Sequence, residues 1–325
     1  MSQLLLEVKD LNAQFSVGKQ TVTALDGISF DIQKNQTVGI VGESGSGKSV
    51  TALSIMGLLA ANGKITQGQI NYNGQNLVGL NQMDYRQIRG KEIGLIFQNP
   101  MAALNPVFTI GNQMIETIRL HTQKSKAEAQ DYAISLLTAV GIPDPQTRLT
   151  QYPHQFSLGM CQRVMIALTL SMSPKLLIAD EPTASLDVTI QAQILTLLAQ
   201  LKKDTGMSML IISHDLGVMA QHCDHILVMY LGKIVESGTP EDIFMRPKHP
   251  YTQALISSIP STDPTKKHAP TLLKGDIPSP LHLPTGCRFH TRCPKAQSKC
   301  TTAEPQLQQI ESQKFACFYA TLPPL

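Results

Sequence analysis

Residues 42–49 read Gly-Glu-Ser-Gly-Ser-Gly-Lys-Ser, which matches the phosphate-binding pattern GxxxxGK[ST] over its whole length. The segment follows an apolar, β-rich run at Thr37–Val41 and leads into a helical pattern over Ser49–Leu59. Such a loop binds phosphate only when a strand delivers it to the N-terminus of a helix. The feature therefore predicts an α/β fold built around a strand–loop–helix unit that binds a nucleoside triphosphate.

The residue types within this loop match the chemistry of phosphate binding. Its three glycines let the backbone curve around an anion with N–H groups pointing inward. Lys48 is expected to reach the β- and γ-phosphates, and the Ser49 hydroxyl is expected to contact Mg²⁺. The predicted phosphate-binding set is Gly42, Glu43, Ser44, Gly45, Ser46, Gly47, Lys48 and Ser49.

The rest of the chain alternates in a way that is typical of a parallel sheet covered by helices. Short strands are expected up to about residue 110, and a helical zone is expected over about 111–170. Strands and helices then alternate up to about residue 240. The expected strands are Leu5–Leu11, Val22–Ile32, Thr37–Val41, Gln69–Tyr72, Ile93–Gln98, Leu176–Ala179, Ser208–Ser213 and Ile226–Tyr230, and Val188–Lys203 is the expected amphipathic helix.

Two carboxylates end the apolar strand at Leu176–Ala179. In an open parallel sheet, ligands bind at the carboxyl ends of the strands, so Asp180 is placed to hold Mg²⁺ directly or through water. Glu181 follows and is predicted to polarise the attacking water as a general base. Two further polar residues, Gln98 and His214, also stand at the ends of predicted strands.

The order of these motifs closely resembles the ATP-binding subunits of ABC transporters. The resemblance covers residues 4–260. Its motifs are, in order, a phosphate loop, a glutamine after a strand, Asp-Glu, Ser185-Leu186-Asp187 and a histidine at a strand end. The resemblance implies an ABC-type P-loop NTPase domain at 1–260, with an antiparallel β subdomain and a helical subdomain. It also implies that Gln98 contacts Mg²⁺ and senses the membrane partner, that His214 contacts the γ-phosphate, and that Phe15 stacks on adenine.

One motif departs from the family pattern. Residues 155–163 resemble the LSGGQ-type signature, but Leu158 replaces the first glycine, whereas Ser157 and Gly159 remain. In this family, two subunits meet head to tail and the signature of one closes over the ATP held by the other. Leucine adds bulk and disfavours positive φ. A heterodimer with a paralogous ATPase that carries an unaltered signature is therefore expected, the alternative being that a small backbone shift accommodates Leu158.

The C-terminal part has a different composition, because 13 of the 20 prolines lie in residues 240–325. This predicts an irregular extension at 261–325. The segments His249–Thr252 and Gly286–Pro294 resemble the extension of dipeptide and oligopeptide permease ATPases. Four cysteines with C-x5-C-x6-C-x16-C spacing predict a [4Fe–4S] cluster, with a zinc site or unligated thiols as alternatives: Cys287, Cys293, Cys300 and Cys317.

Composition limits the remaining possibilities. A net charge of +3 and 16% charged residues argue against a nucleic-acid-binding surface. No secretory signal and no apolar run of about 20 residues is visible, which favours a cytoplasmic protein that meets a membrane through its partners.

The expected function is the ATPase subunit of a peptide importer, peripheral at the cytoplasmic face of the inner membrane. Its expected partners are two permeases and a periplasmic or lipoprotein peptide-binding protein. A nickel or other small-solute importer remains an alternative because the ATPase does not read the substrate. A soluble ABC-type ATPase is a further alternative. It is disfavoured because only one cassette is present and 108 residues without heptads separate Lys48 from Ser157.

Overall fold

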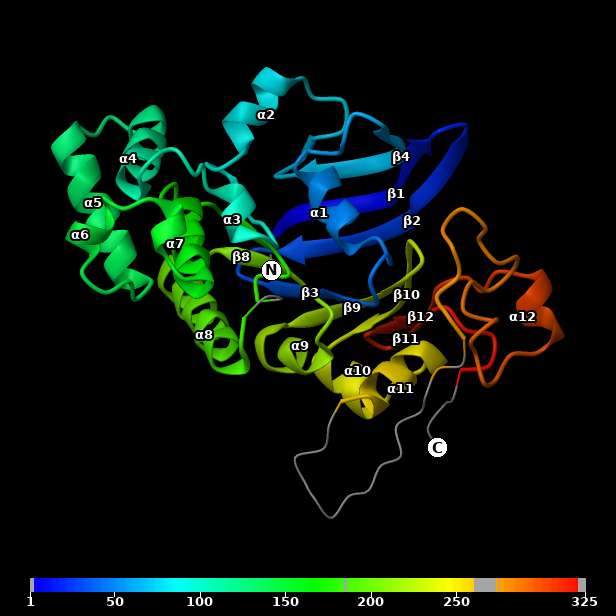
Figure 1. Cartoon of the computed structure of the whole chain (residues 1–325). Helices are drawn as coiled ribbons and strands as arrows, with labels where there is room; N and C mark the ends of the chain where they lie inside the picture. Colours follow the sequence, from blue (N-terminus) through cyan, green and yellow to red (C-terminus); the bar gives the residue numbers. More distant parts are fainter. Residues whose placement is uncertain (1–2, 184–185, 260–272, 274, 321–325) are drawn as a thin grey trace, which may run out of the picture. The chain divides into compact units, whose positions relative to one another are not determined.

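A computed structural model describes residues 3–183, 186–259, 273 and 275–320 (Figure 1). The chain divides into two compact units, each of which is described separately. One consists of Met1–Gly79 with Ile212–Leu325, and the other is Leu80–Ile211. Helices and strands are mixed in both units, which confirms the predicted α/β class.

The first unit contains an antiparallel sheet with the strand order β2-β1-β4-β5. Apolar residues of the central strand β1, such as Leu6, Val8 and Leu11, are buried between its neighbours and the core. The strands are longer than the apolar patterns predicted, because backbone pairing continues into polar positions. Their bounds are β1 (Leu4–Val17), β2 (Gln20–Gln33), β4 (Gly63–Tyr72) and β5 (Gln75–Asn76).

The strand that precedes the phosphate loop belongs to another sheet of the same unit, with the order β11-β12-β10-β9-β3. All five residues of β3 are buried, which explains the uniformly apolar character of this run. It pairs in parallel with β9, whereas β10 and β12 continue the sheet antiparallel. The bounds are β3 (Thr37–Val41), β9 (His225–Tyr230), β10 (Lys233–Gly238), β11 (Gln308–Ile310) and β12 (Gln313–Phe315).

Short helices complete this unit. Thr239 and Asp242 form a capping box at the start of α10, and Pro240 occupies its first turn, where no backbone donor is needed. Between residues 275 and 320 the described chain forms only α12, β11 and β12. The helices are α1 (Lys48–Ile55), α9 (Leu216–His222), α10 (Pro240–Met245), α11 (Pro250–Ser257) and α12 (Ser298–Thr302).

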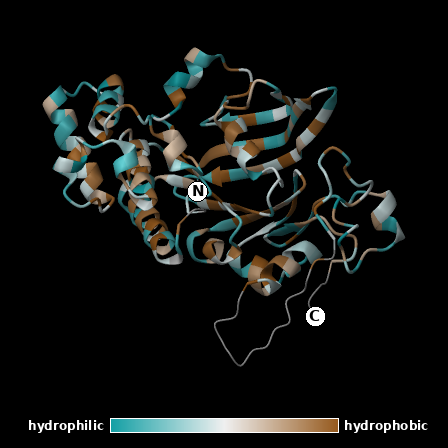
Figure 2. Cartoon of the chain, in the orientation of Figure 1, coloured by the Kyte–Doolittle hydropathy of each residue, from teal (hydrophilic) through white to brown (hydrophobic). Residues whose placement is uncertain are grey.

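The second unit has strands in the order β8-β7-β6, with β6 and β7 paired in parallel. The last two residues of β8 belong to the first unit. Figure 2 shows hydrophobic residues along α7 and polar residues on α2. The elements are α2 (Gln82–Ile88), β6 (Ile93–Ile96), α3 (Pro100–Ala103), α4 (Ile110–His121), α5 (Lys126–Ala139), α6 (Pro145–Arg148), the 3-10 turn η1 (Pro153–Gln155), α7 (Leu158–Leu170), β7 (Leu176–Asp180), α8 (Val188–Thr205) and β8 (Ser208–Ser213).

None of the helices in the described ranges combines the length and the apolar character that a membrane span requires.

Candidate nucleotide site

The phosphate loop packs so closely on its surroundings that two of its glycines cannot be replaced without a shift. A Cβ atom at Gly42 would lie 2.2 Å from the carbonyl oxygen of Met229. At Gly47, where φ is 106°, it would lie 2.8 Å from the carbonyl oxygen of Ala24. The N–H group of Gly232 donates to the Ser46 carbonyl at 2.8 Å. The core of the first unit therefore fixes the curvature of the loop.

Lys48 crosses the inside of this loop. Its side chain is 5% exposed, and its ammonium group donates to the carbonyl oxygens of Gly42 at 2.8 Å and Glu43 at 3.1 Å. Helix α1 begins at the same residue. A buried cation, backbone N–H groups and a helix N-terminus together attract an anion, so the local arrangement fits a phosphate group.

Two residues predicted from separate motifs meet in the second unit. The Gln98 side-chain amide donates to the Glu181 carboxylate at 2.8 Å. Glu181 directly follows the buried strand β7, which ends at Asp180. Its φ of 46° is left-handed, a conformation that costs a non-glycine residue about 1 kcal/mol or more. The chain therefore turns sharply off the strand at the carboxylate that sequence reasoning selects as the general base.

Comparison with known proteins identifies the family. A family model described as "ABC transporter" matches residues 25–184, and one described as "Oligopeptide/dipeptide transporter, C-terminal region" matches residues 235–300. The oligopeptide transport ATP-binding protein AppD of Bacillus subtilis is 49% identical, with 97% of this chain and 96% of that protein covered. This chain belongs to the ATP-binding proteins of ABC transporters.

Further relatives and solved structures agree with this assignment. The dipeptide transport ATP-binding protein DppD of Haemophilus influenzae is 47% identical, with 96% of this chain and 94% of that protein covered. The ATP-binding cassette MJ0796, solved as a dimer with ADP and Pi, superposes with a TM-score of 0.66 at 25% identity. That match covers 72% of this ABC ATPase and 98% of the cassette.

The altered signature forms the start of helix α7. Ser157 is the N-cap residue, and its hydroxyl accepts a hydrogen bond from the Met160 N–H at 3.3 Å. Leu158 is the first helical residue and is not among the residues with positive φ. A Cβ atom at Gly159 would lie 3.3 Å from the Ile190 side chain. The backbone at Leu158 is therefore unstrained, and any effect of the leucine must come from its bulk.

The other residues named from the family resemblance lie in different settings. The half-buried ring of Phe15 lies on Gly63, where a Cβ atom would come within 2.5 Å of the ring. His214 is exposed directly after β8. Asp187 caps α8 by accepting from the Ile190 N–H at 3.0 Å, whereas Ser185 lies outside the described residues.

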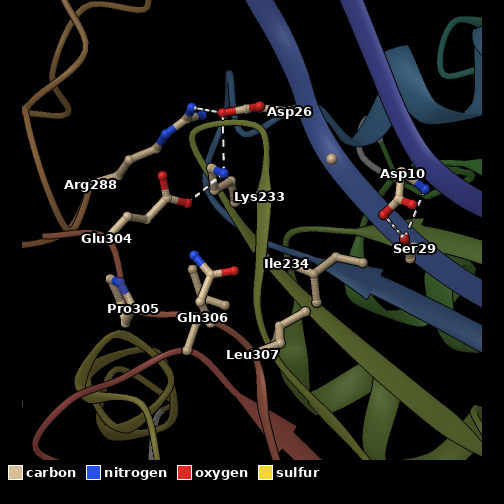
Figure 3. A pocket seen from close by; sticks show the side chains of 13 residues that line it. Asp10, Asp26, Ser29, Lys233, Ile234, Arg288, Glu304, Pro305, Gln306 and Leu307 are labelled. Carbon is tan, nitrogen blue, oxygen red and sulfur yellow. Dashed lines mark hydrogen bonds and ion pairs between the residues drawn. The ribbon is translucent and has the colours of Figure 1, made fainter. Parts of the chain in front are cut away.

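The C-terminal extension is fastened to the first unit by charged groups. Figure 3 shows Asp26 in contact with both Arg288 of the extension and Lys233 of β10, and Lys233 also pairs with Glu304. Arg288 donates to the Leu231 carbonyl as well. These groups line a cavity of about 270 Å³. The partners of each charge lie far apart in sequence, so these ion pairs hold the extension against the rest of this unit.

The prediction of a [4Fe–4S] cluster in the extension is wrong. Among the described residues, which include all four of its cysteines, no group of three or more His, Cys, Asp or Glu side chains can hold a metal ion. The finding also removes the zinc alternative. Burial raises the pKa of the Cys287 thiol to about 11, and it raises the pKa values of Cys293 and Cys317.

Sequence reasoning missed a group of residues that contact the phosphate loop. Glu43 appeared only as a variable position of the loop pattern, yet its side chain binds Arg292 of the extension. Tyr251 also reaches the loop, because its hydroxyl accepts from the Glu43 N–H at 2.9 Å. The sequence signals were the segments His249–Thr252 and Gly286–Pro294, which contain Tyr251 and Arg292 but do not indicate that either residue contacts the phosphate loop.

Proposed function

We propose that this ABC ATPase powers the import of dipeptides or oligopeptides. Support comes from relatives called oligopeptide or dipeptide transport ATP-binding proteins, which match this chain over both the ATPase region and the extension. The C-terminal match at residues 235–300 carries most weight, since ABC ATPases in general share only the nucleotide-binding part.

The nucleotide is assigned to ATP, with Mg²⁺ bound to its phosphates. Lys48 and the inward N–H groups of the loop neutralise the β- and γ-phosphates, and the hydroxyl of Ser49 contacts the metal ion. Asp180 and Gln98 supply further oxygen atoms, the donor type that Mg²⁺ prefers. Phe15 stacks on the adenine ring. The close packing of its half-buried ring on Gly63 supports this role, because it holds the ring in one orientation.

Hydrolysis requires that a water molecule be aligned with the γ-phosphate. Glu181 accepts a proton from this water, and His214 contacts the γ-phosphate. The hydrogen bond from Gln98 orients the Glu181 carboxylate, so a movement of Gln98 driven by the membrane partner would change the position of the base. Such positioning and charge neutralisation account for most of the acceleration that an enzyme gives to phosphoryl transfer.

Nucleotide binding and turnover measured in the assembled transporter test this mechanism. Lys48→Ala is expected to weaken ATP binding, because it removes a buried cation from the loop. Glu181→Gln should retain ATP binding and lose hydrolysis by about 100-fold or more, since the base is removed while the phosphate contacts remain. Full turnover by Glu181→Gln would contradict the role of this residue.

The transporter is expected to contain two permeases, a peptide-binding protein and a second, paralogous ATPase, and to lie at the cytoplasmic face of the inner membrane. Ser157 and Gly159 would close over the ATP of the partner. Because Leu158 adds bulk at that point, the partner's ATP site should turn over slowly. The site built on Lys48 and Glu181 would receive an unaltered signature and turn over readily.

Substitution of the general base in each ATPase separately tests this asymmetry. Loss of the base here should abolish most hydrolysis, whereas loss of the partner's base should have a small effect. Leu158→Gly should increase hydrolysis at the partner's site. Equal losses from the two base variants, or no gain from Leu158→Gly, would support a leucine that is simply accommodated.

A further inference from the structure

The phosphate loop and the C-terminal extension are joined by a direct ion pair. Arg292 donates from its two terminal nitrogens to the two carboxylate oxygens of Glu43, at 2.6 and 3.1 Å. The two residues are 249 positions apart in sequence, and both belong to the first unit. Arg292 is only 9% exposed, whereas the Glu43 side chain is 26% exposed, so the pair is partly shielded from water. A contact through two hydrogen bonds of this kind fixes distance and angle together.

The surroundings of this pair hold both ends in place. Tyr251 accepts a hydrogen bond from the Glu43 N–H, so one loop residue is fastened at its backbone and at its side chain. Arg292 lies 6.0 Å from the centroid of the Tyr230 ring and donates to the Tyr230 hydroxyl at 3.5 Å. Phe289, three residues before Arg292, packs on the rings of Tyr230 and Tyr251. The phosphate loop therefore contacts a cluster that consists of three aromatic rings and the guanidinium of Arg292.

The charge of Glu43 explains why such a contact matters. The residue places a carboxylate within the loop whose N–H groups and Lys48 attract an anionic ligand. Without a partner, this carboxylate would repel the triphosphate of ATP and weaken binding. The hydrogen bond with Glu43 raises the pKa of Arg292, which keeps the guanidinium charged at any physiological pH. Arg292 therefore neutralises the one negative side chain of the loop.

We propose that Arg292 is a positioning residue through which the C-terminal extension sets the affinity of the phosphate loop for ATP. The inference rests on the proposed ATP binding. Since coupling between two sites is reciprocal, ATP should in turn stabilise the docked extension. The extension would then serve as part of the nucleotide site rather than as a separate appendage.

Four variants of the full-length ATPase test the proposal by their dissociation constants for ATP. Arg292→Gln should weaken ATP binding by roughly tenfold, within the range usual for coupled sites. Glu43→Gln should have a smaller effect, because it removes the repelling carboxylate itself and leaves Arg292 in place. The double variant Glu43→Gln/Arg292→Gln should bind ATP about as well as Glu43→Gln alone. This rescue is expected from charge neutralisation, whereas loss of a purely structural support would not be repaired by a second loss.

Arg288→Gln is the matched control, because Arg288 fastens the same extension through Asp26 and the Leu231 carbonyl without contacting the phosphate loop. Its affinity for ATP should stay within about twofold of the native value. Hydrogen exchange provides a second readout. ATP should slow exchange of the Arg292 amide, which donates to the Phe289 carbonyl, in the native protein and not in the Glu43→Gln variant.

Unchanged ATP affinity in Arg292→Gln, no rescue in the double variant, or an equal loss in Arg288→Gln would overturn the proposal. So would native hydrogen exchange that ATP leaves unaffected. These outcomes are distinct from failure of the proposed function, in which the native protein itself would not bind ATP.

Discussion

Phe289→Ala should detach the extension from its core, because this side chain is the centre of the aromatic cluster that joins them. The ring is 1% exposed. Its centroid lies 5.2 Å from that of Tyr230, 5.4 Å from Tyr251 and 5.6 Å from His249. Burial lowers the pKa of His249 to about 3, so all four rings are uncharged at neutral pH. The cluster is therefore an apolar contact between the extension, β9 and the start of α11.

The cost follows from the size and burial of the ring. Phe→Ala substitutions in well-packed cores cost about 3–5 kcal/mol, a figure that includes the transfer of the ring and the cavity left behind. Each edge-to-face pair of aromatic rings in such a cluster contributes about 0.5–1.5 kcal/mol beyond the burial of its surface. We expect a loss of about 4 kcal/mol in the free energy that docks the extension. At 1.4 kcal/mol per factor of ten, this corresponds to an opening equilibrium shifted by roughly three orders of magnitude.

Hydrogen exchange of the Ala316 amide measures this opening directly, since that N–H donates to the Val235 carbonyl of β10 at 2.9 Å. Its exchange should accelerate about 1,000-fold in Phe289→Ala, whereas amides of α7 in the second unit should be unaffected. Leu307→Ala is the control, because Leu307 is 43% exposed and its removal should cost about 0.5 kcal/mol or less. Acceleration below about tenfold, or equal acceleration in α7, would refute the reasoning.

Two further predictions concern the nucleotide site. Gln98→Ala should lower ATP turnover by about tenfold, because it removes the hydrogen bond that orients Glu181. It should lower the affinity for ATP with Mg²⁺ by less than this, because Asp180 and Ser49 still contact the metal ion. Stopped-flow and equilibrium binding measurements separate the two effects, and a change in affinity alone would contradict the assignment. Gly63→Ala should displace the Phe15 ring, since its new Cβ atom would lie 2.5 Å from a ring carbon. ATP affinity should then fall about as far as in Phe15→Ala, and a native affinity would exclude adenine stacking.

The sequence by itself determined the parts of this protein that depend on local patterns. The phosphate loop was identified because its glycines, lysine and serine must follow one another between a strand and a helix. The buried strand ending at Asp180 and Glu181 was predicted for a similar reason, since an uninterrupted apolar run followed by acids is visible over six residues. Element boundaries were less well predicted, because β1 and β2 extend through polar positions that pair by backbone alone.

The tertiary structure decided what depends on contacts between distant segments. The cysteine spacing predicted a cluster, yet spacing does not fix where thiols point, and the described residues provide no such ligand set. The helical backbone at Leu158 removes the strain that its substitution for glycine had suggested. Glu43 and Arg292 carry no pattern that relates them, because an ion pair across 249 residues is created only when β9, α11 and the extension pack together. Sites built from consecutive residues could therefore be recognised in the sequence, whereas the coupling between the extension and the phosphate loop arises from tertiary packing.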